Sequence, residues 1–574
     1  MHASSTFSND QILGRRNANV HDTFCCANPT NYSFSLICGN RSLQHQNPLR
    51  SLPPPGSEIT VTTSTMMVDN SSYDVGETDD SYMVAATTTT TMTVMMKITS
   101  ATQQTLKPLA IITVKDSSHV QVTVKCAKSN NIQIRIRSGG HDYEGLSNVS
   151  DMPYVIIDLL HLNSIDVNLE EETAWVESGA ILGKIYYTIA MKNNSLAFPS
   201  GVCFSVGAGG QLSSAGHGNL MRKFGLSIDN TIDAKIVDVN GNILDRRSIE
   251  KDLFWAIRGG GGASFGVILS WKLKLIQVTL EVTVFNVKRN VNEDVTDVFY
   301  KWQLIAPKLH KDLFIRAQHN VVQIGEHGEK VVQVSFIGQF LGTIERLLPL
   351  INESFPELGL KKSDCSSMSW INSTFFDPKP VYFKGKSDYV KKPIPREALK
   401  SMWKLMIEGE TLSMQWNPYG GRMEEISPSK TPFPHRAGNL FMIQYFNSWT
   451  EECPKTIERH VNFSRLFYEF MTPYVSNSPT EALLNYRDVD IGANHPSNLT
   501  KIDVARTYGS KYFKENFERL VSVKTKVDPD NFFRHEQSIP SREGKERLSR
   551  GKEEKPFPCL GGKKPTKRRK GGLM

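Results

Sequence analysis

Three glycine-rich segments are the part of this sequence whose residue types and spacing best suit chemistry. They cover residues 137–147, 201–218 and 258–266, and each follows or joins a stretch with strand character. Glycine adopts positive φ angles and lets backbone N–H groups approach a phosphate closely. One such segment alone is equally well explained as a tight turn. Three of them within 130 residues are what a large diphosphate cofactor needs.

The common nucleotide-binding motifs are absent. The glycine pattern of dinucleotide-binding βαβ units has glycine at its first, third and sixth positions. It fails at 207–212, where Leu212 is last, and at 261–266, where Ala263 is third. No P-loop sequence occurs either. A cofactor therefore needs a different fold.

Two side chains in these segments have reactive atoms: His141 lies in the first segment and Cys203 in the second. By residue type alone, a cysteine is most often a buried apolar thiol, and a histidine in a turn is most often a capping residue. None of the eight cysteines forms a pair separated by two residues. We therefore expect neither a zinc site nor a redox dithiol, and no metal.

The segments resemble the berberine bridge enzyme-like oxidases of plants, which belong to the vanillyl-alcohol-oxidase class of FAD proteins. The resemblance follows the family's motif order and extends from about residue 107 to residue 540, roughly three quarters of the chain. Residues outside that span do not share it. The motifs that carry it are 137–141, 201–203, 252–262, 417–421, 432–436, 485–488, 528–533 and 536–540.

The resemblance implies FAD held by two covalent bonds. A ring nitrogen of His141 would bond the 8α carbon of the isoalloxazine, and the sulfur of Cys203 would bond its carbon 6. Two links would hold the cofactor and raise its reduction potential, which favours hydride uptake from difficult donors. Further cofactor contacts are implied for Arg137, Ser138, Gly139, Gly140, Gly207, Gly209, Gly210, Gly216, Val267 and Asn531.

The resemblance also implies a reaction, in which hydride leaves a C–H bond of an alcohol, carbohydrate or alkaloid-type small molecule. Hydride loss from an alcohol leaves a proton for a base to remove. Tyr486 matches a tyrosine that the family offers as this base, although an ordinary phenol, with a pKa of about 10, is a poor base at neutral pH. Gln444 stands where some members carry glutamate, and its amide would orient the substrate.

Two residues depart from the family pattern where the base is tuned. His217 replaces a second tyrosine, and Met442 replaces a lysine. Losing the cation removes the simplest way to lower the phenol pKa. His217 would either act as the base, with an ordinary pKa of about 6.5, or only fill an aromatic position. The alternative function is therefore a catalytically impaired flavin-binding homologue. Smaller departures stand at Phe204, Ser205, Gln211, Ser214 and Ala215.

Val206, three residues after Cys203, stands where the family controls oxygen access to the flavin. A valine there resembles the oxygen-reactive type, and leucine the dehydrogenase type. We therefore expect an oxidase that reduces O2 to H2O2.

The surrounding pattern predicts an α+β fold. Strand 109–114, helix 119–128 and strand 132–137 form a βαβ unit, and further strands are expected at 154–160, 174–177, 231–237 and 267–275. Downstream, strands at 331–337 and 440–445 alternate with helices at 295–305, 396–408 and 454–471. One amphipathic helix is expected over 505–526, ending before Asp528 and Pro529.

The resemblance assigns these elements to domains. Residues 107–278 would form a two-piece PCMH-type FAD-binding domain, 279–500 an α+β substrate domain with a large antiparallel sheet, and 501–540 a segment returning to the FAD domain. The atypical N-terminus, 1–106, and the basic tail, 541–574, fit neither. We hypothesise that both ends are artefacts of the gene model, which sequencing of the transcript ends would test.

The net charge of +8 raises the rival interpretation of a nucleic-acid-binding protein. The tail 541–574 holds 12 Lys/Arg and 4 Asp/Glu, and so accounts for the whole excess. The rest of the chain is neutral and has no basic patch interleaved with aromatic residues. No run of 18 apolar residues predicts a transmembrane helix. We expect a monomer whose partners are a small-molecule substrate and O2, with no nucleic acid.

The sequence gives conflicting indications of the cellular location of the protein. The resemblance implies the secretory pathway, with an extracellular, cell-wall or vacuolar location, but residues 1–30 contain no apolar core of a signal peptide. It also implies a disulfide from Cys126 to a cysteine near the N-terminus, for which Cys25, Cys26 and Cys38 are candidates. Glycosylation sequons typical of a secreted glycoprotein begin at Asn148, Asn193, Asn352, Asn372, Asn462 and Asn498.

Overall fold

The predicted βαβ unit is the first element of the fold, with one strand inserted. Strand β1 (Ala110–Thr113), helix α1 (Ser117–Ser129) and strand β2 (Gln133–Arg137) follow in sequence. Strand β3 (Tyr154–Asp158) lies between β1 and β2, and the three strands are parallel. The side chain of Asp116 caps α1 by accepting a hydrogen bond from the Ser118 backbone at 2.9 Å.

The computed structural model describes residues 106–325, 328–374, 381–494 and 501–542. The expectations for the rest of the N-terminus, for the basic tail beyond residue 542, for Asn498 and for the three N-terminal cysteines fall outside these ranges. In the described part of the chain, every helix is too short or too polar to cross a membrane.

A second, five-stranded antiparallel sheet follows, with the strand order β4-β5-β9-β7-β8. Its strands are β4 (Ile165–Asn168), β5 (Thr173–Glu177), β7 (Thr231–Val237), β8 (Ile243–Leu244) and β9 (Val267–Lys274). Helices α2 (Leu182–Lys192), α3 (Ala208–Ser214), α4 (Met221–Phe224) and α5 (Lys251–Ile257) lie between them in sequence, and β6 (Leu196–Ala197) pairs with β10 (Ile276–Gln277).

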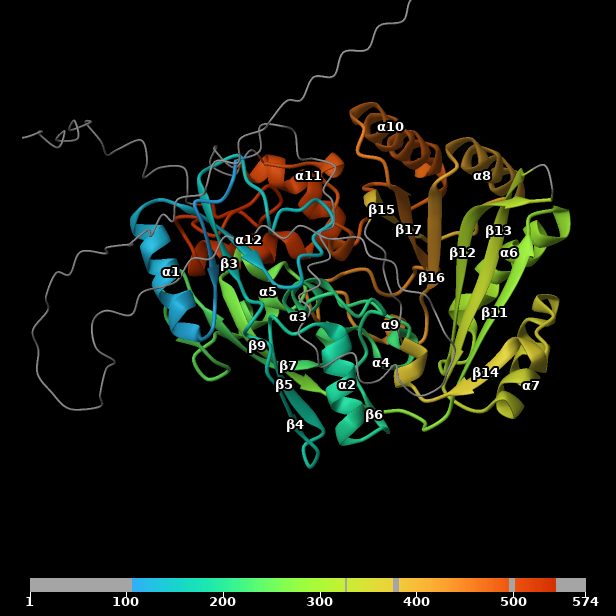
Figure 1. Cartoon of the computed structure of the whole chain (residues 1–574), viewed down its shortest axis with the longest axis horizontal. Coiled ribbons are helices and arrows are strands. Elements are labelled where there is room, and N and C mark those ends of the chain that lie inside the picture. Colours follow the sequence, from blue (N-terminus) through green and yellow to red (C-terminus); the bar gives the residue numbers. More distant parts are fainter. Residues whose placement is uncertain (1–105, 326–327, 375–380, 495–500, 543–574) are drawn as a thin grey trace, which may run out of the picture. The chain divides into compact units, whose positions relative to one another are not determined.

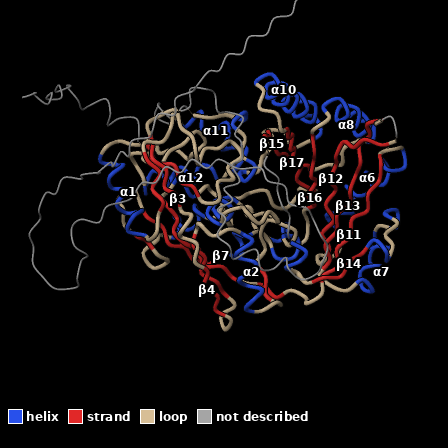
Figure 2. The backbone as a smooth tube through the Cα atoms, viewed as in Figure 1, coloured by secondary structure: helices blue, strands red, loops and turns tan. Residues whose placement is uncertain are grey.

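The expected large antiparallel sheet is confirmed, with seven strands in the order β14-β11-β13-β12-β16-β17-β15. Figures 1 and 2 show it beside the first two sheets. The strands are β11 (Val282–Asn290), β12 (Leu313–Ile324), β13 (Glu329–Phe340), β14 (Cys365–Met368), β15 (Tyr382–Val390), β16 (Leu412–Pro418) and β17 (Phe441–Trp449).

One face of this sheet is buried under helices. Side chains of β12, β13, β16 and β17 form a single apolar core with helices α6 (Glu293–Ile305), α7 (Ile344–Ser354), α8 (Arg396–Gly409) and α10 (Pro454–Met471). Along β12, Ile315, Ala317 and His319 point into this core. Because strand side chains alternate, Arg316 and Gln318 point to the opposite face.

The prediction of one helix over 505–526 is wrong. Helix α11 (Ile502–Phe513) is followed by Lys514, which has a positive φ of 49°, and α12 (Asn516–Val527) then begins. A Cβ at Gly509 would lie 2.3 Å from the Phe517 ring, so the two helices pack closely at this glycine. The expected end of the helical segment before Asp528 is confirmed, because α12 ends at Val527.

Arg222 of α4 joins the first part of the chain to the large sheet. Its fully buried guanidinium donates hydrogen bonds to five main-chain carbonyls, those of Pro307, Leu309, His310, Leu313 and Tyr419. These carbonyls belong to the approach to β12 and to the loop after β16. A single cation therefore satisfies buried acceptors from two separate connections.

We predict that Arg222→Met lowers the free energy of unfolding by about 3 kcal/mol or more, because it leaves these carbonyls buried without donors. The matched control is Arg422→Met in α9 (Arg422–Glu425), where an exposed arginine pairs with Glu425 at 2.8 Å. Its loss should change stability by less than about 1 kcal/mol. Urea denaturation followed by tryptophan fluorescence compares them, and equal midpoints would contradict the role given to Arg222.

Candidate active site

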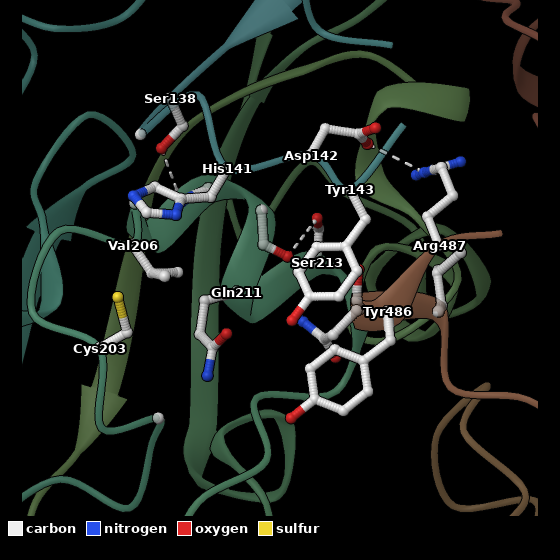
Figure 3. Close-up of a pocket in the computed structure, with 18 of the residues that line it drawn as sticks. Ser138, His141, Asp142, Tyr143, Cys203, Val206, Gln211, Ser213, Tyr486 and Arg487 are labelled. Carbon is white, nitrogen blue, oxygen red and sulfur yellow. Dashed lines mark hydrogen bonds and ion pairs between the residues drawn. The ribbon is translucent and has the colours of Figure 1, made fainter. Parts of the chain in front are cut away.

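The three glycine-rich segments converge on one cavity of about 480 Å³. The open face of the seven-stranded sheet and residues 483–487 complete its wall. In Figure 3, His141, Val206 and Cys203 stand along one side and the Tyr143 and Tyr486 rings along the other. In the described ranges, no group of three or more His, Cys, Asp or Glu is arranged to hold a metal ion.

The structure brings most of the sequence-predicted site residues to this cavity. They come from loops and strands that are far apart in the chain. Those that line it are Ser138, Gly139, Gly140, His141, Cys203, Gly207, Gly209, Gly210, His217, Gln444 and Tyr486.

Four of the predicted residues do not line the cavity. Arg137 turns away and pairs with Asp158 at 2.7 Å. Gly216, with a φ of 74°, lies against Ser227, so that a Cβ there would meet the serine hydroxyl at 2.1 Å. The two remaining residues, Val267 and Asn531, are buried in the protein.

The first two glycine segments touch at Gly139 and Gly207. A Cβ on Gly207 would lie 2.2 Å from the Gly139 nitrogen and from Ser138 Oγ, and a Cβ on Gly139 would lie 2.3 Å from the Gly207 nitrogen. Ser138 Oγ donates to the Ser178 carbonyl at 2.5 Å and accepts from the Gly209 N–H at 3.3 Å. Only glycine permits this approach, which places the His141 and Cys203 loops against each other.

His141 and Cys203 both line the cavity. Burial lowers the pKa of His141 to about 4, against the effect of the Ser205 backbone, so the imidazole is neutral at pH 7. Its Nε2 is buried and has no hydrogen-bond partner among the described residues. The half-buried sulfur of Cys203 lies 3.6 Å from the Ser205 hydroxyl. The backbone that contacts His141 is thus two residues from Cys203.

Further polar atoms of the cavity wall lack partners. Besides His141, the side chains of His217, Asn485 and Arg487 each have a buried polar atom without a hydrogen bond to the described part of the chain: Nε2, Oδ1 and Nη1 respectively. Leaving a buried donor or acceptor unpaired costs about 1–3 kcal/mol. The cavity therefore fits a large ligand with polar groups along its length.

Tyr143, which the sequence did not single out, stacks on Tyr486 with ring centroids 5.2 Å apart. Gln444 donates from Nε2 to the Tyr143 hydroxyl at 2.7 Å. Burial raises the pKa of Tyr143 well above its ordinary value and also raises the pKa of Tyr486. In the sequence, Tyr143 lies in the first glycine-rich segment and Tyr486 in the motif 485–488. No periodic pattern connects two positions so far apart in the chain, so their stacking could not be predicted.

Arg316 of β12 is the second residue that sequence reasoning missed. Its Nε donates to Asn417 Oδ1 at 2.6 Å and its Nη2 to Asn219 Oδ1 at 3.2 Å, and the side chain lines the cavity. Its charge opposes the rise in the Tyr486 pKa. The alternation of apolar and polar residues in 315–318 would have predicted a strand that presents this arginine to one face.

The two residues that depart from the family pattern have different surroundings. Burial, helped by the positive charge of Arg316, lowers the pKa of His217 to about 3, so its imidazole is neutral. Met442 does not line the cavity but packs in an apolar cluster with Tyr389, Tyr419 and other residues. A methionine there therefore suits its apolar neighbours.

A chain of buried charges fixes the position of the stacked tyrosines. Lys384 Nζ of β15 lies 2.5 Å from Glu144 and 2.9 Å from Asp488. Lys386 Nζ, on the same strand, lies 2.7 Å from Asp488 and 2.7 Å from Asp490. Glu144 follows one stacked tyrosine in the chain and Asp488 follows the other. The strand therefore holds both tyrosine-bearing segments.

Comparison with known proteins agrees with this site. Two family models match: "FAD binding domain" over residues 108–246, and "Berberine and berberine like" over residues 482–540. Berberine bridge enzyme-like 3 of Arabidopsis thaliana is 52% identical over 449 residues, which cover 75% of this chain and 83% of that protein.

Solved structures give the same result. The structure of BBE-like #28 from Arabidopsis thaliana has a TM-score of 0.73 and 42% identity, and the match covers 78% of this chain and 96% of that chain. Phl p 4, a grass pollen allergen with glucose dehydrogenase activity, has a TM-score of 0.72 and 40% identity, and the match covers 77% of this chain and 92% of that chain.

The contact of the two glycine loops predicts opposite effects of two alanine substitutions. Gly207→Ala should lower the unfolding free energy by at least about 1–3 kcal/mol, because its Cβ overlaps backbone atoms that cannot move aside. Gly210→Ala is the control, since a Cβ there meets no heavy atom within 4 Å and lies inside α3, where alanine is favoured over glycine. Thermal unfolding followed by circular dichroism measures both. Equal stability of the two variants would argue against the close contact.

Proposed function

This chain belongs to the berberine bridge enzyme-like family of FAD-linked oxidoreductases, and from that premise we propose that it is an oxidase of hydroxylated small molecules. Its substrate would be an alcohol, a carbohydrate or an alkaloid. The single observation that carries the proposal is that the tyrosine pair, Arg316 and the two reactive loop residues line one cavity. FAD, when bound, supplies the acceptor for the hydride.

We propose that His141 and Cys203 attach the cofactor covalently, at the 8α carbon and at carbon 6. The proposal is supported by a neutral imidazole with an unpartnered Nε2 and by the sulfur on the adjoining loop. The unpaired polar atoms of Asn485 and Arg487 fit the polar part of FAD. Backbone groups at Ser138, Gly139, Gly140, Gly207, Gly209 and Gly210 would bind along its length.

The four predicted cofactor residues outside the cavity wall would act on the cofactor indirectly. Arg137 would do so through its ion pair with Asp158, which fixes the end of β2 before the His141 loop. Gly216 allows the close contact with Ser227 beside the Cys203 segment. Val267 and Asn531 would support the site from the buried side.

Tyr486 is the proposed base that takes the proton of the substrate hydroxyl. Because burial raises its pKa, the phenol is mostly protonated at neutral pH. The positive charge of Arg316 stabilises the phenolate. This is the role that the resemblance gives to the lysine that Met442 replaces. The expected pH dependence follows: the rate rises with pH towards the pKa of Tyr486, because only the phenolate accepts a proton.

His217 is proposed to orient the substrate rather than to accept its proton. With a pKa of about 3, its imidazole is a weak proton acceptor, but its Nε2 is free to form a hydrogen bond. Gln444 holds the Tyr143 hydroxyl and would position the substrate from the sheet side. Since the site retains a cation beside Tyr486, the impaired homologue is the less favoured alternative.

Molecular oxygen is the proposed final electron acceptor, with H2O2 as product. The support is Val206, a small side chain that lines the cavity and lies between His141 and Cys203 in Figure 3. A bulkier residue there would narrow the path to the ring. Replacing Val206 by leucine while measuring H2O2 release tests this assignment.

We also propose that this plant protein is secreted, glycosylated and monomeric. Three sequon asparagines, Asn352, Asn372 and Asn462, are exposed, as a glycan acceptor must be. Asn148 is instead hydrogen-bonded to Arg137 and Ser147. Glycan mapping of the secreted chain by mass spectrometry would test the assignment site by site.

The covalent links predict a simple chemical result. After acid precipitation of the full-length holoenzyme, the flavin should remain with the protein pellet. His141→Ala and Cys203→Ala should each keep one link, and only the double variant should release its flavin into the supernatant. Absorbance of pellet and supernatant near 450 nm measures the distribution. Complete release from the unsubstituted protein would remove the covalent proposal.

Tyr486 and Arg316 are predicted to act together. Tyr486→Phe should lower kcat/KM by about 10²–10⁴-fold, the usual contribution of a base. Arg316→Met should shift the rising limb of the pH profile to higher pH, since the phenolate loses its stabilising charge. Arg422→Met serves as the control. The rate of flavin reduction is measured for each variant by anaerobic stopped-flow spectroscopy over a range of pH. If His217→Phe lowered this rate strongly and Tyr486→Phe did not, His217 rather than Tyr486 would be the base.

A further inference from the structure

The sheet face that lines the cavity carries a row of amide side chains. In the strand register, Gln318 of β12 lies opposite Gln415 of β16, and Gln415 lies opposite Gln444 of β17. All three line the cavity. Because residues paired across antiparallel strands project to the same face, the three glutamines form one line that crosses the strands.

The three amides differ in their partners. Gln444 is committed to the Tyr143 hydroxyl at 2.7 Å. Within the described ranges, the side chains of Gln318 and Gln415 form no hydrogen bond, and neither amide is enclosed by protein. Both are half-buried and open to the cavity, so their donors and acceptors are available to a ligand.

The spacing of the row gives the length of that ligand. Neighbouring strands lie about 4.8 Å apart, so the row from Gln444 to Gln318 spans about 10 Å. Gln444 marks the end beside the proposed base, and Gln318 marks the far end. A ligand that meets both ends is longer than a single sugar ring.

The chemistry of the row favours neutral hydroxyl groups. An amide offers donors and acceptors at once and carries no charge, which suits hydroxyls that both donate and accept. The nearest cation, Arg316, already has acceptors in Asn417 and Asn219. A compact aromatic alcohol would cover Gln318 and Gln415 without pairing them, which is unfavourable for polar groups removed from water.

The neighbouring row completes such a subsite. Ser413 lies two residues before Gln415 on the same face, opposite Phe446 of β17, and both line the cavity. A hydroxyl and an aromatic ring beside free amides offer hydrogen bonds to the edge of a sugar and an apolar surface to its face.

We propose that Gln318 and Gln415 form a distal subsite for a neutral polyhydroxylated substrate of at least two sugar rings, whose oxidised hydroxyl lies at the Tyr486 end. The inference rests on the proposed oxidase function for the reaction, but not for the binding. Its measurable consequence is a preference for disaccharides over monosaccharides that depends on the two glutamines.

The test compares holoenzymes carrying Gln318→Leu, Gln415→Leu and the control Gln323→Leu, an exposed glutamine of the same strand outside the cavity. Binding of a disaccharide alditol is measured by calorimetry. Oxidation of cellobiose, glucose and benzyl alcohol is measured by flavin reduction. Gln318→Leu and Gln415→Leu should each weaken alditol binding and raise the KM for cellobiose roughly 3- to 10-fold, the worth of one hydrogen bond. The KM for benzyl alcohol and the flavin content should stay unchanged.

The outcomes separate the two proposals. If alditol binding depends on the two glutamines, the subsite is supported even when none of the alcohols is oxidised. Absence of any oxidation would contradict only the proposed oxidase function. Oxidation of benzyl alcohol without any sugar binding would overturn the subsite and leave the oxidase standing. Equal losses for all ligands, or losses equal to those of Gln323→Leu, would also overturn it.

Discussion

The site depends first on the chain of buried charges along β15. Lys384 and Lys386 are almost fully buried; Lys384 pairs with three carboxylates and Lys386 with two. Removing charges from water is expensive, so such a cluster persists only while every member keeps its partners. Its members come from the loop after β2, from the large sheet and from the segment after Tyr486. The three parts are therefore fixed together or not at all, and the stacked rings of Tyr143 and Tyr486 take their places as a consequence.

The glycine loops and the sheet contribute different groups to the cavity. The loops approach each other so closely at Gly139 and Gly207 that no side chain fits between them, and they contribute backbone groups and two reactive atoms. The sheet contributes side chains in ordered rows, because its alternation buries one set under helices and presents the other to the cavity. One wall thus suits a cofactor and the other a substrate.

Sequence could predict the first wall better than the second. The glycine-rich motifs are local, so His141 and Cys203 stand out from their motifs alone, and several strands and helices follow from period-two and helical patterns. Arg316 stands out in neither way, because a single arginine within 313–318 forms no motif and its strand is not among those predicted. The alignment of Gln318 with Gln415 needs the register of two strands about a hundred residues apart. The break at Lys514 is missed because the apolar pattern continues through it, and only packing at Gly509 reveals the turn.

The two candidate bases are separated by the same neighbouring charge. A cation disfavours a second positive charge and favours a negative one, so Arg316 lowers the pKa of His217 and opposes the rise in the pKa of Tyr486. For the histidine this adds to burial, and the imidazole loses its strength as a base. For the tyrosine it acts against burial, and the phenolate becomes easier to form. The electrostatics of the cavity thus favour Tyr486 wherever both residues compete for one proton. Under the proposed function, Arg316 would then stabilise the phenolate in place of the lysine that the family resemblance expects at Met442.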